Sequence, residues 1–179
     1  MSGIMKLRPA RPEDEPFLRQ LRGQVDADRL CMNLWRGEGV DVEKAKILDL
    51  QFRAQAAHHN VLKANWETRE NIIEMDAVSI GRFVITGGGE ELRLVEIALV
   101  PQWRGQGIGQ MVIGATREEC VRSGRVLRLC VEKTNQRAIA LYLAQGFYVI
   151  ENEAMHFVME WSAKGPTGGK VHYFAMPKA

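Results

Sequence analysis

The stretch Leu92–Gln110, LRLVEIALVPQWRGQGIGQ, decides the fold of this chain. Residues 92–100 form a strand with two apolar faces, Val95, Ile97 and Leu99 on one and Leu94, Ala98 and Val100 on the other. A strand that is apolar on both faces is covered on both, which predicts a central strand. Glu96 interrupts the pattern, and a carboxylate is costly to bury without a partner. Glu96 therefore either lines a wet cleft or binds a partner.

A glycine-rich turn follows the strand, because Pro101 cannot donate to a sheet ladder and ends it. Residues 104–109, RGQGIG, carry three glycines at alternate positions, so a ligand can approach the backbone closely. The helix expected from Ile108 to about Ser123 points its free N–H groups and positive dipole end into this turn, which predicts an anion site best suited to phosphate. Gln110 stands where the dinucleotide fingerprint needs its last glycine, and no Gly-Lys-Ser/Thr of a P-loop follows. Nucleotide binding is therefore disfavoured.

The chain after this helix predicts the second part of a mixed sheet. A strand over Val126–Val131 must lie parallel to the central strand, since a helix crosses between them. Asn135 caps a helix that Gly146 ends. A final hairpin pairs residues 147–150 with residues 154–161.

The first ninety residues predict the antiparallel part of the sheet and two helices. The expected elements are a strand at Ile4–Arg8, a helix at Glu13–Leu30, a helix from Asp41 to about Lys63, and a hairpin of 68–74 with 77–86 that turns near Met75-Asp76, before a turn at Gly87-Gly88-Gly89. The fold class is therefore α/β (α+β). We expect a mixed, mostly antiparallel sheet of about seven strands covered by about four helices.

The composition bounds the class of protein. A chain of 179 residues with 46% hydrophobic and 26% charged residues is ordinary for a globular protein, and we expect one domain over 1–163 and a C-terminal tail over 164–179. A net charge of +2 argues against a nucleic-acid partner bound by bulk charge. Cys31, Cys120 and Cys130 form no CxxC motif, which is typical of reduced thiols in the cytoplasm. No export signal and no membrane-spanning apolar run is seen, so no membrane partner is expected.

In the glycine-rich turn and in the strand and helix that follow the helix expected over residues 108–123, the sequence resembles the GNAT superfamily of acyl-CoA-dependent N-acyltransferases. The family's pyrophosphate loop, Arg/Gln-x-x-Gly-x-Gly/Ala after a strand, is matched by Arg104, Gly107 and Gly109. The family's strand–Asn–helix–Tyr–Gly-Phe segment is matched, in the same order, by Leu127–Asn135, Ala138–Tyr142 and Gly146-Phe147. The strong resemblance covers about Leu92–Trp161.

The resemblance implies a cofactor, a reaction and a set of site residues. The central parallel strands are expected to splay and to hold the pantetheine of acetyl-CoA, whose acetyl group passes to a primary amine by direct attack in a ternary complex. No metal is expected. The implied cofactor-binding residues are Ile97, Ala98, Leu99, Arg104, Gly105, Gln106, Gly107, Ile108, Gly109, Gln110, Asn135 and Tyr142. The acceptor, a small-molecule amine or a peptide or protein amine, does not follow from the resemblance, and a homodimer is left open.

Tyr142 and Glu96 are the two expected catalytic residues. In the resembling enzymes the tyrosine meets the sulfur of the cofactor, and we expect Tyr142 to stabilise the leaving thiolate; the alternative is a half-buried aromatic with a satisfied hydroxyl. We expect Glu96 to take the proton of the amine, directly or through water. The alternative is a structural carboxylate bound to Arg93, Arg128 or a backbone amide, and both readings stay open.

Two other functional hypotheses compete with transfer to an amine in a ternary complex. A CoA-binding sensor or scaffold would keep the loop and lose turnover. A covalent acyl-cysteine route through Cys130 is rejected, because no histidine lies nearby in the sequence and small buried cysteines are common.

Overall fold

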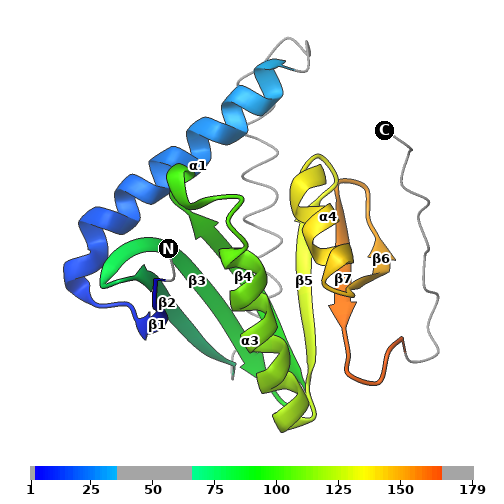
Figure 1. Cartoon of the computed structure of the whole chain (residues 1–179). Coiled ribbons are helices and arrows are strands. Elements are labelled where there is room, and N and C mark those ends of the chain that lie inside the picture. Colours follow the sequence, from blue (N-terminus) through cyan, green and yellow to red (C-terminus); the bar gives the residue numbers. More distant parts are fainter. Residues whose placement is uncertain (1–2, 36–65, 167–179) are drawn as a thin grey trace.

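The computed structural model describes residues 3–35 and 66–166, and one seven-stranded sheet lies at its centre (Figure 1). In chain order the strands are β1 (Met5–Pro9), β2 (Glu67–Met75), β3 (Val78–Gly88), β4 (Glu91–Leu99), β5 (Val126–Glu132), β6 (Tyr148–Asn152) and β7 (His156–Trp161). Their order across the sheet is β1-β2-β3-β4-β5-β7-β6. Among the described strands only β4 and β5 pair in parallel. The predicted fold class is confirmed.

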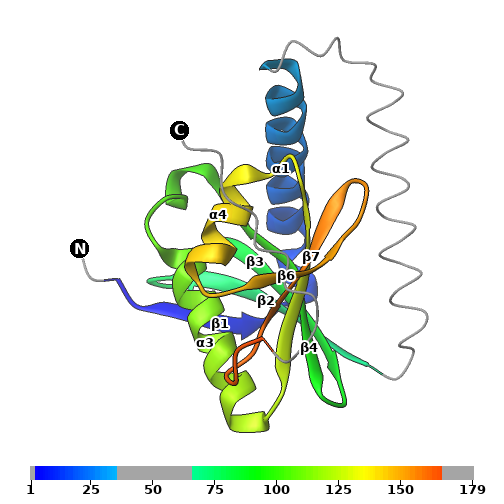
Figure 2. The same ribbon diagram turned by 90° about the vertical axis from the view of Figure 1, so that its right-hand side faces the viewer.

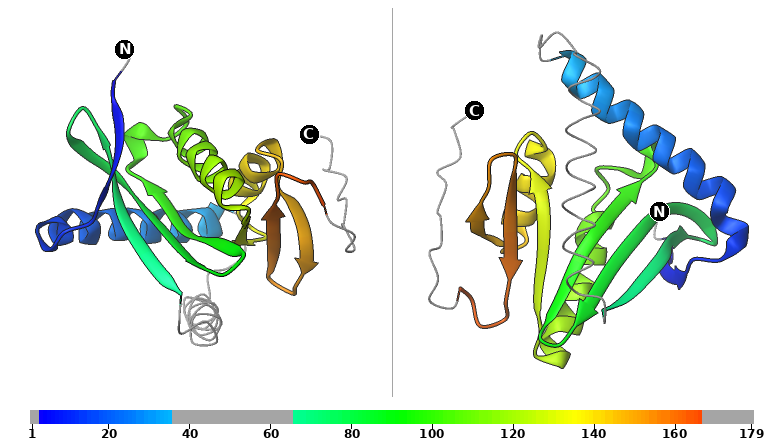
Figure 3. Two further views of the ribbon diagram at one scale, coloured as in Figure 1. Left: turned by 90° about the horizontal axis from the view of Figure 1, so that it is seen from below. Right: turned by 180° about the vertical axis from the view of Figure 1, so that it is seen from behind.

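Three α-helices are described, where about four are expected: α1 (Glu15–Trp35), α3 (Ile108–Ser123) and α4 (Gln136–Ala144). Two short 3₁₀ turns, η1 (Pro12–Asp14) and η2 (Pro101–Trp103), precede α1 and the glycine loop. The helix expected from Asp41 to about Lys63 lies outside the described residues. Figure 2 shows α3 and α4 on the same side of β5 and β7, and the view from behind in Figure 3 shows α1 on the other side.

The hairpin of β2 and β3 turns one residue later than expected. Asp76 and Ala77 have φ angles of 49° and 65°, the left-handed pair that matches the twist of a two-residue hairpin. Gly87 and Gly88 belong to β3 rather than to a turn, and the chain reverses at Gly89, whose φ is 57°. The indole ring of Trp66 packs where a Cβ on Gly88 would lie, so a glycine is required there.

The central strand contains a bulge that the alternating pattern did not predict. Val84 pairs with Glu96, but its neighbour Ile85 pairs with Leu94, so Val95 is the extra residue. An extra residue breaks the two-residue alternation and bends the strand. The side chain expected on a covered face is consequently 48% exposed at Val95, and that part of the prediction is wrong.

The two central parallel strands separate directly beside this bulge. Their pairing runs from Glu91↔Val126 to Leu94↔Leu129 and then stops, although β4 continues to Leu99. Figure 1 shows the strands meeting at the bottom of the view and diverging upwards. The bend at the bulge turns β4 away from β5. The splay implied by the family resemblance is therefore present.

Candidate active site

The glycine loop has the backbone conformation that a bare turn needs. Gly105 and Gly107 have φ angles of 77° and 79°, in the left-handed region that favours glycine. Gly107 is also the N-cap of α3, and no side chain caps the first turn of this helix. A Cβ added at either glycine would meet no protein atom closer than 3.6 Å, so the loop faces open space. Uncapped N–H groups at a helix N-terminus suit an anion.

The backbone of Leu99 points into the gap that β5 leaves. The amide of Val100 donates to the carbonyl oxygen of Ile80 in β3 at 2.9 Å, and neighbouring residues of an antiparallel strand alternate between its two edges. The N–H and C=O groups of Leu99 therefore face the opposite edge. On that edge the Nε of Arg104 donates to the Leu99 carbonyl at 2.7 Å, which ties the loop to β4.

Three elements converge at the open end of the splay. A Cβ built on Gly109 would lie 3.8 Å both from Cδ1 of Ile97 in β4 and from Cδ2 of Leu141 in α4. The first turn of α3, the end of β4 and the middle of α4 thus form one site. Within it Ala98 and Ile108 are buried, whereas Gly105, Gln106 and Gln110 are exposed.

Tyr142 is held in α4 as a buried phenol. Its side chain is 8% exposed and its ring centroid lies 5.6 Å from that of Phe147. Burial raises the pKa of Tyr142 to about 12. Within residues 3–35 and 66–166 the hydroxyl donates no hydrogen bond to another residue. Tyr142 therefore keeps its proton throughout the neutral range and can donate a hydrogen bond there.

Asn135 caps α4, as predicted. Its side-chain oxygen accepts a hydrogen bond from the amide of Ala138 at 3.1 Å, which satisfies a free donor of the first turn. In the described part of the chain its side chain makes no hydrogen bond with Tyr142.

Glu96 is both exposed to solvent and paired. Its Oε2 lies 2.6 Å from Nη1 of Arg82, and 39% of its side chain is exposed. The same guanidinium binds Oε1 of Glu70 through Nε at 2.7 Å. The expected partners Arg93 and Arg128 are the wrong ones, because both bind Glu91 instead, at 2.9 and 3.0 Å. Arg82 lies two residues before Val84, the partner of Glu96 across β3 and β4, and so it shares a face with Glu96.

Cys130 is a poor nucleophile in this environment. Burial raises the pKa of its thiol, although Nη1 of Arg93 lies 3.8 Å from the sulfur. The thiolate is the reactive form of cysteine, so the rejection of an acyl-cysteine route agrees with the structure.

Sequence reasoning missed three basic or acidic residues near the site, Glu70, Arg82 and Arg137. Nη2 of Arg137, in the first turn of α4, lies 3.6 Å from the Cβ position of Gly105, next to the loop. The sequence could have indicated Arg137, because it lies two residues after Asn135, the predicted N-cap of α4. The sequence could not have indicated Arg82 as a partner of Glu96, because the register of β3 against β4 depends on the bulge.

The described residues contain neither a metal-binding cluster nor a membrane-spanning helix. Within 3–35 and 66–166 no group of three or more His, Cys, Asp or Glu side chains is placed to hold a metal ion. No helix in these same ranges is long and apolar enough to cross a membrane.

Comparison with known proteins agrees with this geometry. The sequence model of the acetyltransferase (GNAT) family matches residues 29–147. The chain is similar to PaiA N-acetyltransferase of Thermoplasma acidophilum, solved with coenzyme A (17% identity over 90% of this chain and 99% of that one, TM-score 0.64). It is also similar to the ribosomal-protein-S18-alanine N-acetyltransferase of Escherichia coli (14%, 95% and 100%, TM-score 0.58). A third similar structure is the spermidine N-acetyltransferase of Vibrio cholerae with CoA and spermine (17%, 89% and 96%, TM-score 0.56). At these identities the structures support the fold alone.

Proposed function

Because the chain belongs to the GNAT acetyltransferase family, we propose that it moves an acetyl group from acetyl-CoA to a primary amine by direct attack in a ternary complex. One observation carries the proposal. The pairing of β4 with β5 stops at Leu94↔Leu129, and the uncapped N-terminus of α3 opens beside the unpaired part of β4. An extended ligand with a diphosphate at one end fits such a site, because its chain can follow a free strand edge and its phosphates a helix N-terminus.

The proposed cofactor contacts follow from the free edge of β4 and the N-terminus of α3. The loop residues Arg104–Gly107 and the amides of 108–110 would bind the pyrophosphate, with Asn135 at the adjacent N-cap of α4. Residues 97–99 would bind the pantetheine along the free edge. The amide of Leu99, which faces this edge, would donate to the thioester oxygen as negative charge develops there.

In the proposed reaction the amine must be deprotonated and the leaving thiolate must be stabilised. The amine must lose its proton, and we assign this step to Glu96, directly or through water, since 39% of its side chain is exposed to solvent. Attack on the thioester carbon gives a tetrahedral intermediate whose nitrogen is positively charged. This nitrogen loses a second proton to solvent, and cleavage of the C–S bond then gives the amide and releases the thiolate. Full proton transfer from Tyr142, at a pKa of about 12, to a thiolate of reference value near 8.5 is uphill by about 5 kcal/mol. Tyr142 is therefore assigned a hydrogen bond to the leaving sulfur, and the released thiolate then takes a proton from solvent.

We also propose that the protein works in the cytoplasm, where thiols stay reduced. Cys120 and Cys130 are both free thiols, and burial raises the pKa of Cys120 to about 11.

The test is acetyl-CoA-dependent release of free thiol in the presence of single primary amines. We expect at least one small amine or amine-bearing peptide to accelerate thiol release well above the hydrolysis measured without acceptor, with one acetyl amide formed per thiol. CoA binding by calorimetry without thiol release from any acceptor would instead support the sensor or scaffold. Absence of CoA binding would contradict both.

A further inference from the structure

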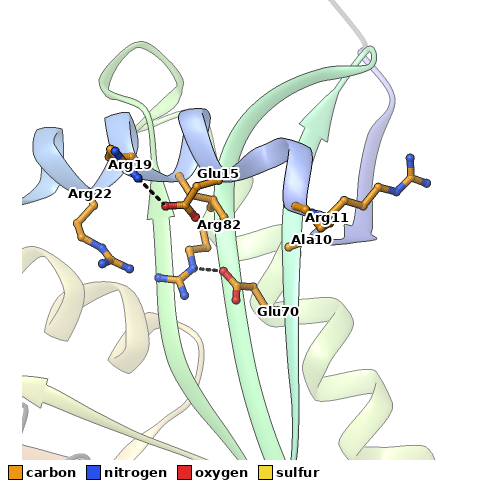
Figure 4. A pocket seen from close by; sticks show the side chains of 9 residues that line it. Ala10, Arg11, Glu15, Arg19, Arg22, Glu70 and Arg82 are labelled. Atoms are coloured by element: carbon orange, nitrogen blue, oxygen red, sulfur yellow. Dashed lines mark hydrogen bonds and ion pairs between the residues drawn. The ribbon is translucent and has the colours of Figure 1, made fainter.

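A cleft lies between α1 and the strands β2 and β3, on the side of the sheet opposite α3 (Figure 4). Its volume is about 560 Å³, which lies within the usual range for sites that hold small molecules. The residues that line it are Ala10, Arg11, Pro12, Glu15, Leu18, Arg19, Arg22, Glu70 and Arg82.

The cleft adjoins the candidate base through Arg82. This guanidinium lines the cleft, binds Glu70 inside it at 2.7 Å, and binds Glu96 of β4 at 2.6 Å. Arg82 therefore connects the lining of the cleft to Glu96, which is not itself a lining residue. The glycine loop and α3 lie on the other side, so the cleft leaves the proposed cofactor site free.

The charges of the cleft are unbalanced. Its lining holds four arginines and two glutamates, and both glutamates already bind arginines of the lining, Glu15 with Arg19 at 3.4 Å and Glu70 with Arg82 at 2.7 Å. Arg22 takes part in no ion pair within the described residues. Figure 4 shows its side chain reaching from α1 towards the space beside Arg82, whereas Arg11 points away from the other side chains. Among the described residues, Arg22 is thus the guanidinium that faces the cleft without an ion pair.

We propose that this cleft binds the acceptor, and that the acceptor is a small amine that carries a carboxylate or a phosphate group. The proposal rests on the proposed function and names its substrate class. The anionic group binds Arg22, whose planar fork matches both carboxylate and phosphate oxygens, and the amine lies at the Glu96 end. A polyamine would place further positive charge beside Arg22 and Arg82, and like charges brought together in a partly enclosed site are unfavourable.

The experiment uses amines matched in length that differ in the anionic group. β-Alanine is compared with propylamine for the carboxylate, phosphoethanolamine with ethanolamine for the phosphate, and putrescine serves as the cationic amine. We expect kcat/KM for at least one anionic amine to exceed that of its neutral partner about tenfold or more, with putrescine lowest. If β-alanine is preferred over propylamine, the cleft recognises a carboxylate; if phosphoethanolamine is preferred over ethanolamine, it recognises a phosphate.

Arg22→Gln tests the assigned side chain. Loss of one charge-assisted bond lowers kcat/KM for the anionic amine by about 10- to 100-fold and leaves the neutral amine within about twofold. Arg122→Gln, at an exposed arginine in the last turn of α3, is the matched control and leaves both unchanged. Equal effects of the two substitutions, or a preference for propylamine, ethanolamine or putrescine, would overturn the proposal.

A second measurement separates this proposal from the proposed function. Binding of β-alanine and phosphoethanolamine to the CoA-loaded protein is followed by ligand-observed NMR, which needs no turnover. Binding that Arg22→Gln weakens and Arg122→Gln does not weaken supports the cleft assignment, even if no acetyl transfer is found. Turnover of amines without this dependence on Arg22 would keep the acetyltransferase and reject the cleft as its acceptor site.

Discussion

Arg82 donates to Glu96 at 2.6 Å through Nη1 and to Glu70 at 2.7 Å through Nε, so one guanidinium of β3 joins the carboxylates of the two strands that flank it, β2 and β4. The pair offers a matched test of the base. Glu96→Gln should lower turnover most at low pH, where the amine is mostly protonated, and higher pH should partly restore it because solvent then supplies free amine. Glu70→Gln removes the other carboxylate of Arg82 and should leave the shape of the pH–rate profile unchanged. A Glu96→Gln profile identical to that of the parent would leave water as the base.

The loop prediction uses the two ends of one helix. Gly107→Val places a branched side chain where the pyrophosphate is proposed to bind and should abolish CoA binding. Gly124, the C-cap of the same helix, has a φ of 67° and open space around it, so Gly124→Val carries similar backbone strain, about 1–3 kcal/mol. Calorimetry should show normal CoA affinity for Gly124→Val. Similar CoA affinities of the two folded variants would contradict the phosphate assignment.

The role of Tyr142 can be tested by removing one oxygen. Tyr142→Phe should lower turnover about 10²- to 10³-fold, the range typical of losing one hydrogen-bond donor to developing negative charge, while CoA still binds. The loss should be constant from about pH 6 to pH 10, because the pKa of about 12 keeps the hydroxyl protonated over this range. Full activity of the variant in single-turnover measurements would remove Tyr142 from the mechanism.

Asp14 should make stability sensitive to acid. The Arg8 guanidinium binds its carboxylate at 2.6 Å and lowers its pKa from 3.8 to about 2. A lowered pKa contributes stability that is complete above about pH 4 and is lost as pH falls towards 2. Asp14→Asn should therefore lower the free energy of unfolding by about 1–2 kcal/mol at pH 7. Denaturant unfolding should show this difference shrinking between pH 4 and pH 2; a difference independent of pH would show that packing is responsible.

The domain boundary predicts that residues 164–179 can be removed. Truncation after Ala163 should leave the melting temperature nearly unchanged, because the described part of this segment, up to Pro166, only makes hydrogen bonds with Ser162. A substitution at Trp161, which is buried in β7, should in contrast lower the melting temperature. A drop of many degrees on truncation would show that the tail packs against the domain.

The sequence pattern predicted the order of the described strands and helices, because hydrophobic periodicity, prolines and glycines are local signals. Pro101 follows the end of β4, and Gly107 and Asn135 precede the first residues of α3 and α4, as the pattern predicted. The pattern failed at Val95, since a bulge depends on how β3 pairs with β4 rather than on the residues of β4 alone. The partner of Glu96 failed for the same reason. An ion pair across strands depends on register, and the single inserted residue shifts that register.

The short pairing of β4 with β5 also has a mechanical consequence. Between these strands only four residue pairs, Glu91↔Val126 to Leu94↔Leu129, connect the β1–β4 half of the sheet to the β5–β7 half. Because β4 and β5 share backbone hydrogen bonds at one end only, we expect the two halves of the sheet to move about that end as about a hinge. The largest displacements are then expected at the open end. A ligand strand lying in the opening would supply the missing cross-links, so the sheet reaches its full stiffness only as a complex. If acetyl-CoA binds there as proposed, the sheet would be stiffer while the co-substrate is bound than before and after each turnover.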